Sequence, residues 1–84
     1  MKSRSAFVTY MEIIGALTEG PKLPTRLAQA CNLNFKRLME FAGELEAKGY
    51  IKRGMIDGHE VFSVTSEGLT IHGEFEGLRA KLAI

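Results

Sequence analysis

Cysteine is nearly absent from the sequence, and long apolar runs are missing altogether. Cys31 is the single cysteine, so no intramolecular disulfide can form, which excludes the disulfide-rich secreted class and favours a reducing cytoplasm. No segment approaches the roughly 18 consecutive apolar residues of a membrane-spanning helix. The apolar stretch 6–17 follows two basic residues, as in a signal peptide, but Glu12 interrupts it and no small-residue cleavage site comes after it. We therefore expect a cytoplasmic protein.

Groups of residues that could catalyse a reaction or hold a metal ion are also lacking. The two histidines, His59 and His72, do not have the spacing of metal ligands. The carboxylates show no inward-facing pair for acid–base chemistry, and there is no glycine-rich phosphate loop. Cys31 is most simply a small buried residue. We expect no enzymatic activity, no cofactor, no metal ion and no small-molecule substrate.

The chain is long enough for one domain, and its charge is unevenly distributed. A domain of 84 residues buries only about 60–65% of its unfolded surface, so oligomerisation would add useful stability. The formal net charge is +1, but residues 1–53 carry +4 and residues 54–84 carry −3. This asymmetry suggests that the first part faces an anionic partner and that the last part has another role.

Apolar residues at helical spacing predict a first helix over about residues 5–18, capped by Ser5 or Ser3. Its apolar stripe consists of Phe7, Tyr10, Ile14 and Leu17, with Met11 and Ile13 beside it. Gly20-Pro21 ends this helix, because proline cannot continue it. Lys22 and Leu23 then form a short extended link.

Two further helices are predicted, joined by a tight turn. Pro24 suits the first turn of a helix over about 24–31, where no amide donor is needed. A three-residue turn follows, and its last residue, Asn34, is a good N-cap for a helix over about 35–48. The expected inward face of this third helix is Phe35, Leu38, Phe41, Ala42 and Leu45. Its expected outward face is Lys36, Arg37, Glu40, Glu44 and Ala47.

A β-hairpin and a final helix complete the predicted elements. Asp57-Gly58 between the β-rich segments 50–56 and 59–64 is a strong hairpin signal. Thr65 is expected to cap a helix that reaches about Leu82. Four glycines fall inside predicted helices, where we expect them to allow close helix–helix approach: Gly15, Gly43, Gly73 and Gly77.

The order helix, helix, tight turn, helix, hairpin, helix is typical of a helix-turn-helix followed by a wing. The motifs that carry a family resemblance are Ile13-Ile14-x-x-Leu17, Gly20-Pro21, Thr25-Arg26, Leu33-Asn34-Phe35-x-x-Leu38-x-x-Phe41, Glu44-Leu45-x-x-Lys48-Gly49-Tyr50-Ile51 and Phe62-x-Val64-Thr65-x-x-Gly68. With these motifs in this order, the chain resembles the winged helix-turn-helix regulators of archaea and bacteria. It is most similar to the small archaeal single-domain members that dimerise through a C-terminal helix.

The resemblance implies a mainly helical α+β fold with a three-helix core, a two-stranded wing and a C-terminal dimerisation helix. Residues 1–65 would form the winged helix-turn-helix DNA-binding domain, and residues 66–84 the dimerisation helix. The last helix departs from the pattern, because it is short and contains two glycines, each costing about 1 kcal/mol relative to alanine. This composition argues against an extended coiled coil but not against a short dimer contact.

In such a protein the third helix enters the major groove of DNA, with its first turn nearest the base edges. Arg37 could pair with guanine, although solvation alone is the alternative for both Lys36 and Arg37. For Glu40 we favour an intrahelical pair with Lys36 over a contact with cytosine. Since neighbouring strand residues point to opposite faces, only one of Lys52 and Arg53 is expected to face DNA. The expected DNA-binding residues are Lys22, Thr25, Arg26, Gln29, Asn34, Lys36, Arg37, Lys52, Arg53 and His59.

The last helix carries apolar residues at heptad-like spacing, which favours a contact with a second copy of the chain. The expected dimer interface is Phe7, Tyr10, Ile71, Phe75, Leu78 and Leu82. The alternative is that this stripe packs only on the first helix of its own chain. A two-fold dimer would place two recognition helices roughly 34 Å apart, one turn of duplex DNA.

The sequence therefore predicts a transcriptional regulator that binds double-stranded DNA sequence-specifically as a homodimer, associated with the nucleoid in the cytoplasm. One alternative is an architectural protein that binds DNA without strong sequence preference, against which the near-neutral net charge argues. Another is a winged helix that binds a partner protein. Exposed apolar residues on the recognition face would favour that alternative, and Met39 and Met55 are the residues that decide it.

Overall fold

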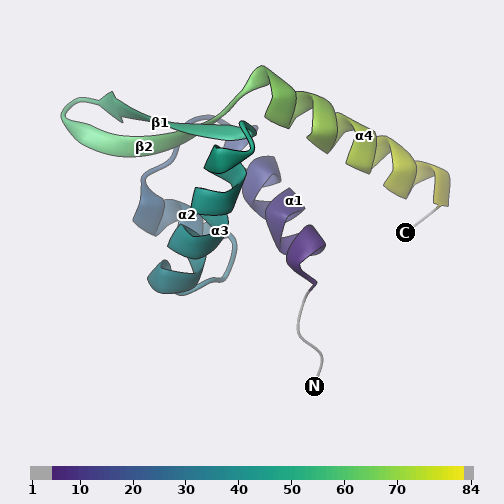
Figure 1. Ribbon diagram of the computed structural model, residues 1–84, viewed down its shortest axis with the longest axis horizontal. Helices are drawn as coiled ribbons and strands as arrows, with labels where there is room; N and C mark the ends of the chain where they lie inside the picture. Colours follow the sequence, from purple (N-terminus) through teal and green to yellow (C-terminus); the bar gives the residue numbers. More distant parts are fainter. Residues whose placement is uncertain (1–4, 83–84) are drawn as a thin grey trace.

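The computed structural model describes residues 5–82. Its elements are α1 (Ala6–Leu17), α2 (Pro24–Ala30), α3 (Phe35–Ala47), β1 (Ile51–Ile56), β2 (His59–Val64) and α4 (Ser66–Leu82). Figure 1 shows α1, α2 and α3 gathered below the hairpin, with α4 extending to the opposite side from the hairpin tip. This arrangement confirms the predicted mainly helical α+β fold. Residues 1–4, with Ser3, and residues 83–84 lie outside the described residues. They are the start of the predicted DNA-binding segment and the end of the predicted dimerisation helix.

Three helices begin at the side-chain caps that the sequence predicts. The Ser5 hydroxyl accepts a hydrogen bond from the Val8 amide at 3.1 Å. The Asn34 side chain accepts from the Arg37 amide at 2.8 Å, and the Thr65 hydroxyl from the Gly68 amide at 3.0 Å. Each cap satisfies an amide that would otherwise lack an intrahelical partner, so the caps fix where α1, α3 and α4 begin.

The hairpin also follows its local sequence signal. Asp57 and Gly58 both adopt positive φ, +52° and +78°, as a two-residue hairpin turn requires. The resulting register pairs Ile56 with His59 at the tip. The link before α2 forms an isolated β-bridge with β2, because Lys22 and Phe62 exchange backbone hydrogen bonds of 3.0 and 2.9 Å. The base of the wing is therefore tied to the helical body.

The core lies where α1, α2 and α3 meet the inner side of the hairpin. Its largest fully buried side chains are Phe62, Ile13, Ile14, Leu17, Leu27, Leu38, Leu45 and Ile51. The prediction that Phe35 points inward is wrong, since its side chain is 51% exposed. Three residues advance a helix by about 300°, so Phe35 is displaced by about 60° from the buried Leu38, and no earlier turn of α3 covers it.

The start of α4 is held against the core by close backbone contact. A Cβ atom on Gly68 would lie 2.2 Å from the carbonyl oxygen of Tyr50, so only glycine fits there. Farther along α4, His72 covers Gly15 of α1, where an added Cβ would lie 2.9 Å from the imidazole Nε2. The predicted close approach is therefore confirmed at Gly15. At Gly43, Gly73 and Gly77 the expected close approach is not found: among residues 5–82, no atom outside the surrounding helical backbone lies within 4 Å of an added Cβ.

Candidate nucleic-acid interface

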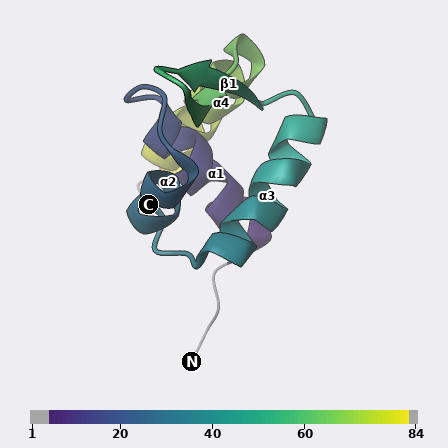
Figure 2. The ribbon, with the colours of Figure 1, turned by 90° about the vertical axis from the view of Figure 1, so that its left-hand side faces the viewer.

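The helix-turn-helix brings α2 and α3 into contact at the end of the molecule below the wing. In Figure 2, which views that end, α2 and α3 lie on either side of α1, with β1 above them. Asn32 takes a positive φ of +57° in the turn, and the Leu33 amide donates to the Ala28 carbonyl at 2.9 Å. Leu33 is half-buried against the core, which anchors the turn. The relative position of α2 and α3 is thus set by packing.

The first turn of α3 presents two exposed cations that differ in their surroundings. Lys36 forms no ion pair among residues 5–82. The Arg37 Nη1 lies 3.3 Å from the Glu40 Oε1, and its guanidinium lies 4.9 Å from the centre of the Phe41 ring. The preferred Lys36–Glu40 pair is therefore corrected to Arg37–Glu40, three residues apart on the helix. An exposed pair of this kind contributes only about 0–1 kcal/mol, so another hydrogen-bond acceptor can replace Glu40 at little cost.

The predicted phosphate-binding residues of α2 lie on its exposed side. Thr25, Arg26 and Gln29 are all exposed, and Arg26 forms no ion pair within the described part of the chain. Lys22, just before the helix, is half-buried and pairs with Glu19 at 3.3 Å. At the start of α3, the side-chain oxygen Oδ1 of Asn34 accepts the hydrogen bond of the helix cap, which leaves the side-chain NH2 group as a donor.

On the wing, Lys52 and Arg53 occupy opposite faces, and their surroundings differ sharply. The Arg53 Nε donates to the Glu46 Oε1 of α3 at 2.9 Å, and Nη1 lies 3.7 Å from the Glu60 Oε2. The hydrogen bond to Glu46 is the main cause that raises the pKa of Arg53 above its ordinary value. Lys52 is exposed and unpaired among residues 5–82, and His59 is exposed at the hairpin tip. Arg53 thus fastens the wing to α3, while Lys52 remains available to a partner.

The same end of the molecule exposes apolar side chains. Met55 near the wing tip is 67% exposed and Ile56 is 48% exposed, and Phe35 opens α3. Met39, by contrast, is half-buried against the core. The sequence signal for Met55 and Ile56 is that both precede the Asp57-Gly58 turn directly, where a two-stranded hairpin extends beyond the core. Phe35 gives no such signal, because its spacing to Leu38 is compatible with either side of the helix.

Some of the predicted dimer residues pack against other helices of the chain, and others are exposed. Phe75 and Ile71 are half-buried, and the Phe75 ring meets the edge of Phe7 with centroids 5.4 Å apart. Tyr10 instead faces α3, where its hydroxyl donates to the Glu44 carboxylate, and this hydrogen bond raises the pKa of Tyr10. The remaining residues of the stripe, Leu78 and Leu82, are exposed. The structure therefore brings Phe7 and Phe75 together, and none of residues 5–82 covers Leu78 and Leu82 in the last two turns of α4.

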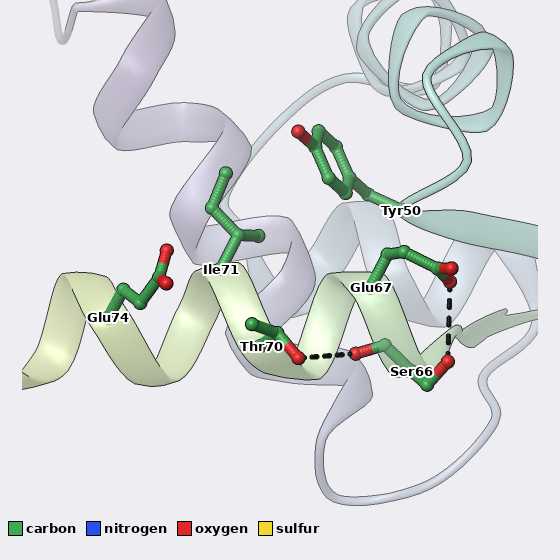
Figure 3. Close-up of a pocket in the computed structure, with 6 residues that line it drawn as sticks. All are labelled: Tyr50, Ser66, Glu67, Thr70, Ile71 and Glu74. Atoms are coloured by element: carbon green, nitrogen blue, oxygen red, sulfur yellow. Dashed lines mark hydrogen bonds between the residues drawn. The ribbon is translucent and has the colours of Figure 1, made fainter.

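Beside the first turns of α4 lies a hollow of about 350 Å³ (Figure 3). It is lined by Tyr50, Ser66, Glu67, Thr70, Ile71 and Glu74. The dashed hydrogen bonds in Figure 3 join the Thr70 hydroxyl to the Ser66 carbonyl at 3.1 Å and the Ser66 hydroxyl to Glu67 at 3.3 Å. Neither a cation nor a histidine lines this hollow. Across residues 5–82, no group of three His, Cys, Asp or Glu side chains is placed to hold a metal ion, and no helix combines the length and apolarity needed to cross a membrane.

Comparison with known proteins gives a consistent picture. A sequence model described as winged helix-turn-helix matches residues 3–82. No curated protein sequence is significantly similar to the chain. The transcriptional regulator BldR from Sulfolobus solfataricus superposes with a TM-score of 0.82 and 20% identity over 90% of this chain and 57% of BldR. The present chain thus spans little more than half the length of that regulator.

Two similar structures are closer in length to this chain. Sso10a-2, a DNA-binding protein from Sulfolobus solfataricus, gives a TM-score of 0.73 at 18% identity, covering 95% of this chain and 86% of that protein. The homodimeric winged helix-turn-helix DNA-binding domain of Mb0332 from Mycobacterium bovis gives 0.79 at 12% identity, covering 93% and 75%. At these identities the likeness establishes the shared fold.

Proposed function

Because this chain belongs to the winged helix-turn-helix family, we propose that it binds double-stranded DNA and regulates transcription. The observation that carries this proposal is the placement of exposed, unpaired cations on three successive parts of the motif. Arg26 on α2, Lys36 on α3 and Lys52 on the wing are exposed and form no ion pair among the described residues. A duplex offers phosphates to all three elements at once, and such contacts fix the register of a protein on DNA.

In this proposal the first turn of α3 lies in the major groove. Arg37 exchanges the weak pair with Glu40 for a bidentate contact with guanine, and Lys36 contacts a phosphate or a neighbouring base. Thr25, Arg26 and Gln29 contact the backbone from α2, together with Lys22 and the Asn34 amide. On the wing, Lys52 and His59 reach the duplex, while Arg53 keeps the wing in place through Glu46.

We assign residues 1–65 to DNA binding and residues 66–84 to formation of a homodimer. Support for the dimer comes from Leu78 and Leu82, which form an exposed apolar continuation of the stripe that begins at Ile71 and Phe75. The homodimeric state of the similar Mb0332 domain agrees with this assignment. Two recognition helices would then meet successive major-groove faces of one operator. Such a regulator would act in the cytoplasm, on the nucleoid.

The test is a titration with fluorescent duplex DNA at several salt concentrations. We expect affinity to fall steeply with salt, and we expect Lys36→Ala to reduce the slope of log K against log salt by about one per subunit. Lys81→Ala removes the same charge from the far end of α4 and is the matched control, with no change expected. Absence of salt-sensitive association at low salt would refute the proposal. Selection of bound sequences from a random pool then separates a specific regulator from an architectural protein.

One observation favours a second candidate, a winged helix that binds a partner protein. Met55 and Ile56 make the wing tip apolar, and its neighbouring charges include the carboxylates of Asp57 and Glu60. Retention on heparin and on random duplex DNA at low salt distinguishes the two candidates, because a protein-binding module has no reason to be retained. Met55→Ser tests the wing tip directly, since it should leave DNA affinity nearly unchanged if this tip serves a protein.

A further inference from the structure

We propose that Phe35 recognises the C5-methyl group of a thymine in the major groove and so sets part of the sequence preference. This inference rests on the proposed function, since it requires that α3 lies in the groove. It adds an apolar contact with a base to the proposed interface, which the lysine and arginine side chains cannot provide.

Phe35 differs from every other phenylalanine among residues 5–82 in having no aromatic or guanidinium neighbour. Phe7 packs on Phe75, Phe41 lies between Tyr10 and Arg37, and the Phe62 ring is covered by the Arg53 guanidinium. The Phe35 side chain is 51% exposed although a phenyl ring gains from burial. The fold of the single chain therefore does not account for a large apolar side chain at this position.

Phe35 lies in the turn of α3 that is nearest to the bases in the proposed complex. It is the first residue of α3, directly after the cap Asn34 and directly before the unpaired Lys36. The early residues of a recognition helix are those that reach the base edges. Met39, four residues later, lies on the same side of α3 and is half-buried, so the helix is held against the core just behind Phe35.

The chemistry of the groove leaves one natural partner for this ring. A phenyl group neither donates nor accepts a conventional hydrogen bond, so it gains nothing from the acceptors of guanine or the amino groups of adenine and cytosine. Thymine alone among the four bases presents an apolar group in the major groove. Burial of one methyl-sized group corresponds to about fourfold in affinity, which is the expected size of the contact in each half-site.

The experiment removes that methyl group and nothing else. Sites are first selected from a random duplex pool with the full chain, and each thymine of a selected site is then replaced in turn by deoxyuridine. We expect one position in each half-site at which the replacement weakens binding about fourfold. In Phe35→Ala, the replacement at that position should no longer change the affinity. Phe35→Leu keeps an apolar side chain and should retain part of the sensitivity. Met55→Ala is the matched control, because it removes an exposed apolar side chain from the wing. This variant should keep the fourfold effect of the deoxyuridine replacement.

Three results would overturn the inference in distinguishable ways. Binding by the wild type that is indifferent to every uracil replacement removes methyl recognition but keeps the proposed function. Sensitivity that persists in a folded Phe35→Ala protein, checked by urea unfolding, assigns the methyl contact to another residue. Failure of the wild type to bind any duplex overturns the proposed function and this inference together.

Discussion

The two longest helices, α3 and α4, meet the core in opposite ways. Four side chains of α3 are buried, namely Leu38, Phe41, Ala42 and Leu45. The only buried residue of the longer α4 is Gly68. The position of α3 is thus fixed by side-chain packing within one chain, whereas that of α4 depends on a close backbone contact in its first turn and on partial contacts farther along.

This difference separates what the single chain determines from what it leaves to partners. Packing on one side of α3 holds its opposite side, with Lys36, and the neighbouring Phe35 at the edge of the packed stripe in fixed directions. The later turns of α4 expose Leu78 and Leu82 without a covering element, a feature that in small proteins commonly marks an interaction surface. Substitutions at matched positions on the two helices can test whether the comparison holds.

The largest effect is expected from Gly68→Ala. The new Cβ would lie 2.2 Å from the Tyr50 carbonyl oxygen and 2.7 Å from the Val64 Cγ2, so α4 or the base of the hairpin must move. We expect a loss of about 3 kcal/mol in the free energy of unfolding, at the upper end for an overpacked site. Urea unfolding measures this loss. Gly77→Ala is the control, because its added Cβ would meet no atom from another element within 4 Å in the described part of the chain.

Equal stability of Gly68→Ala and the wild type would contradict the comparison, since α4 would then have no tight contact with the core. A large loss in both glycine variants would contradict it differently. The C-terminal half of α4 would then be as closely packed as its first turn through contacts in an assembly, so the oligomeric state of each variant is measured alongside.

A smaller effect on stability but a clear effect on assembly is expected from Leu78→Asp. Leu78 belongs to the stripe with Ile71 and Leu82, and a charge there opposes burial against a second copy. We expect the mass measured by sedimentation to fall from dimer to monomer, with weaker operator binding. Leu69→Asp is a matched control, because Leu69 is about as exposed, 50% against 57%, and lies nine residues away on the opposite side of the helix. An unchanged mass for Leu78→Asp would refute the proposed interface.

Features that depend on local sequence could be predicted, and they determine most of the fold. The caps Ser5, Asn34 and Thr65 act within three residues of themselves, and Asp57-Gly58 shapes its own turn. Neither needs knowledge of the rest of the chain. Helical spacing likewise predicted Leu38 and Leu45 as buried, because both lie in the middle of the apolar stripe of α3.

Features that depend on the position of a neighbouring element could not be predicted in the same way. Phe35 lies at the border of the α3 stripe, where burial is decided by how far other helices reach. Arg37 rather than Lys36 pairs with Glu40, and its guanidinium also lies over the Phe41 ring, an arrangement of side chains that spacing along the helix does not reveal. Of the proposed DNA-binding residues, the sequence identified Lys52 and Arg53 as alternatives. The hydrogen bond from Arg53 to Glu46 depends on the position of α3, which the sequence of the strand does not give.

The smallest effect on stability is expected from a glycine-to-alanine substitution that can be made on both helices. At Gly43 of α3 and at Gly73 of α4, an added Cβ would meet no atom of the described residues within 4 Å beyond the surrounding helical backbone. Each change to alanine should therefore raise the free energy of unfolding by up to about 1 kcal/mol, measured in urea. Gly43 lies two turns after Lys36 on the same outward side of α3, so its new methyl group points toward the proposed groove. Gly43→Ala should weaken duplex binding while Gly73→Ala leaves it unchanged. Equal DNA affinity for the two variants would show that the middle of α3 does not approach the duplex closely, and would confine base contacts to the first turn.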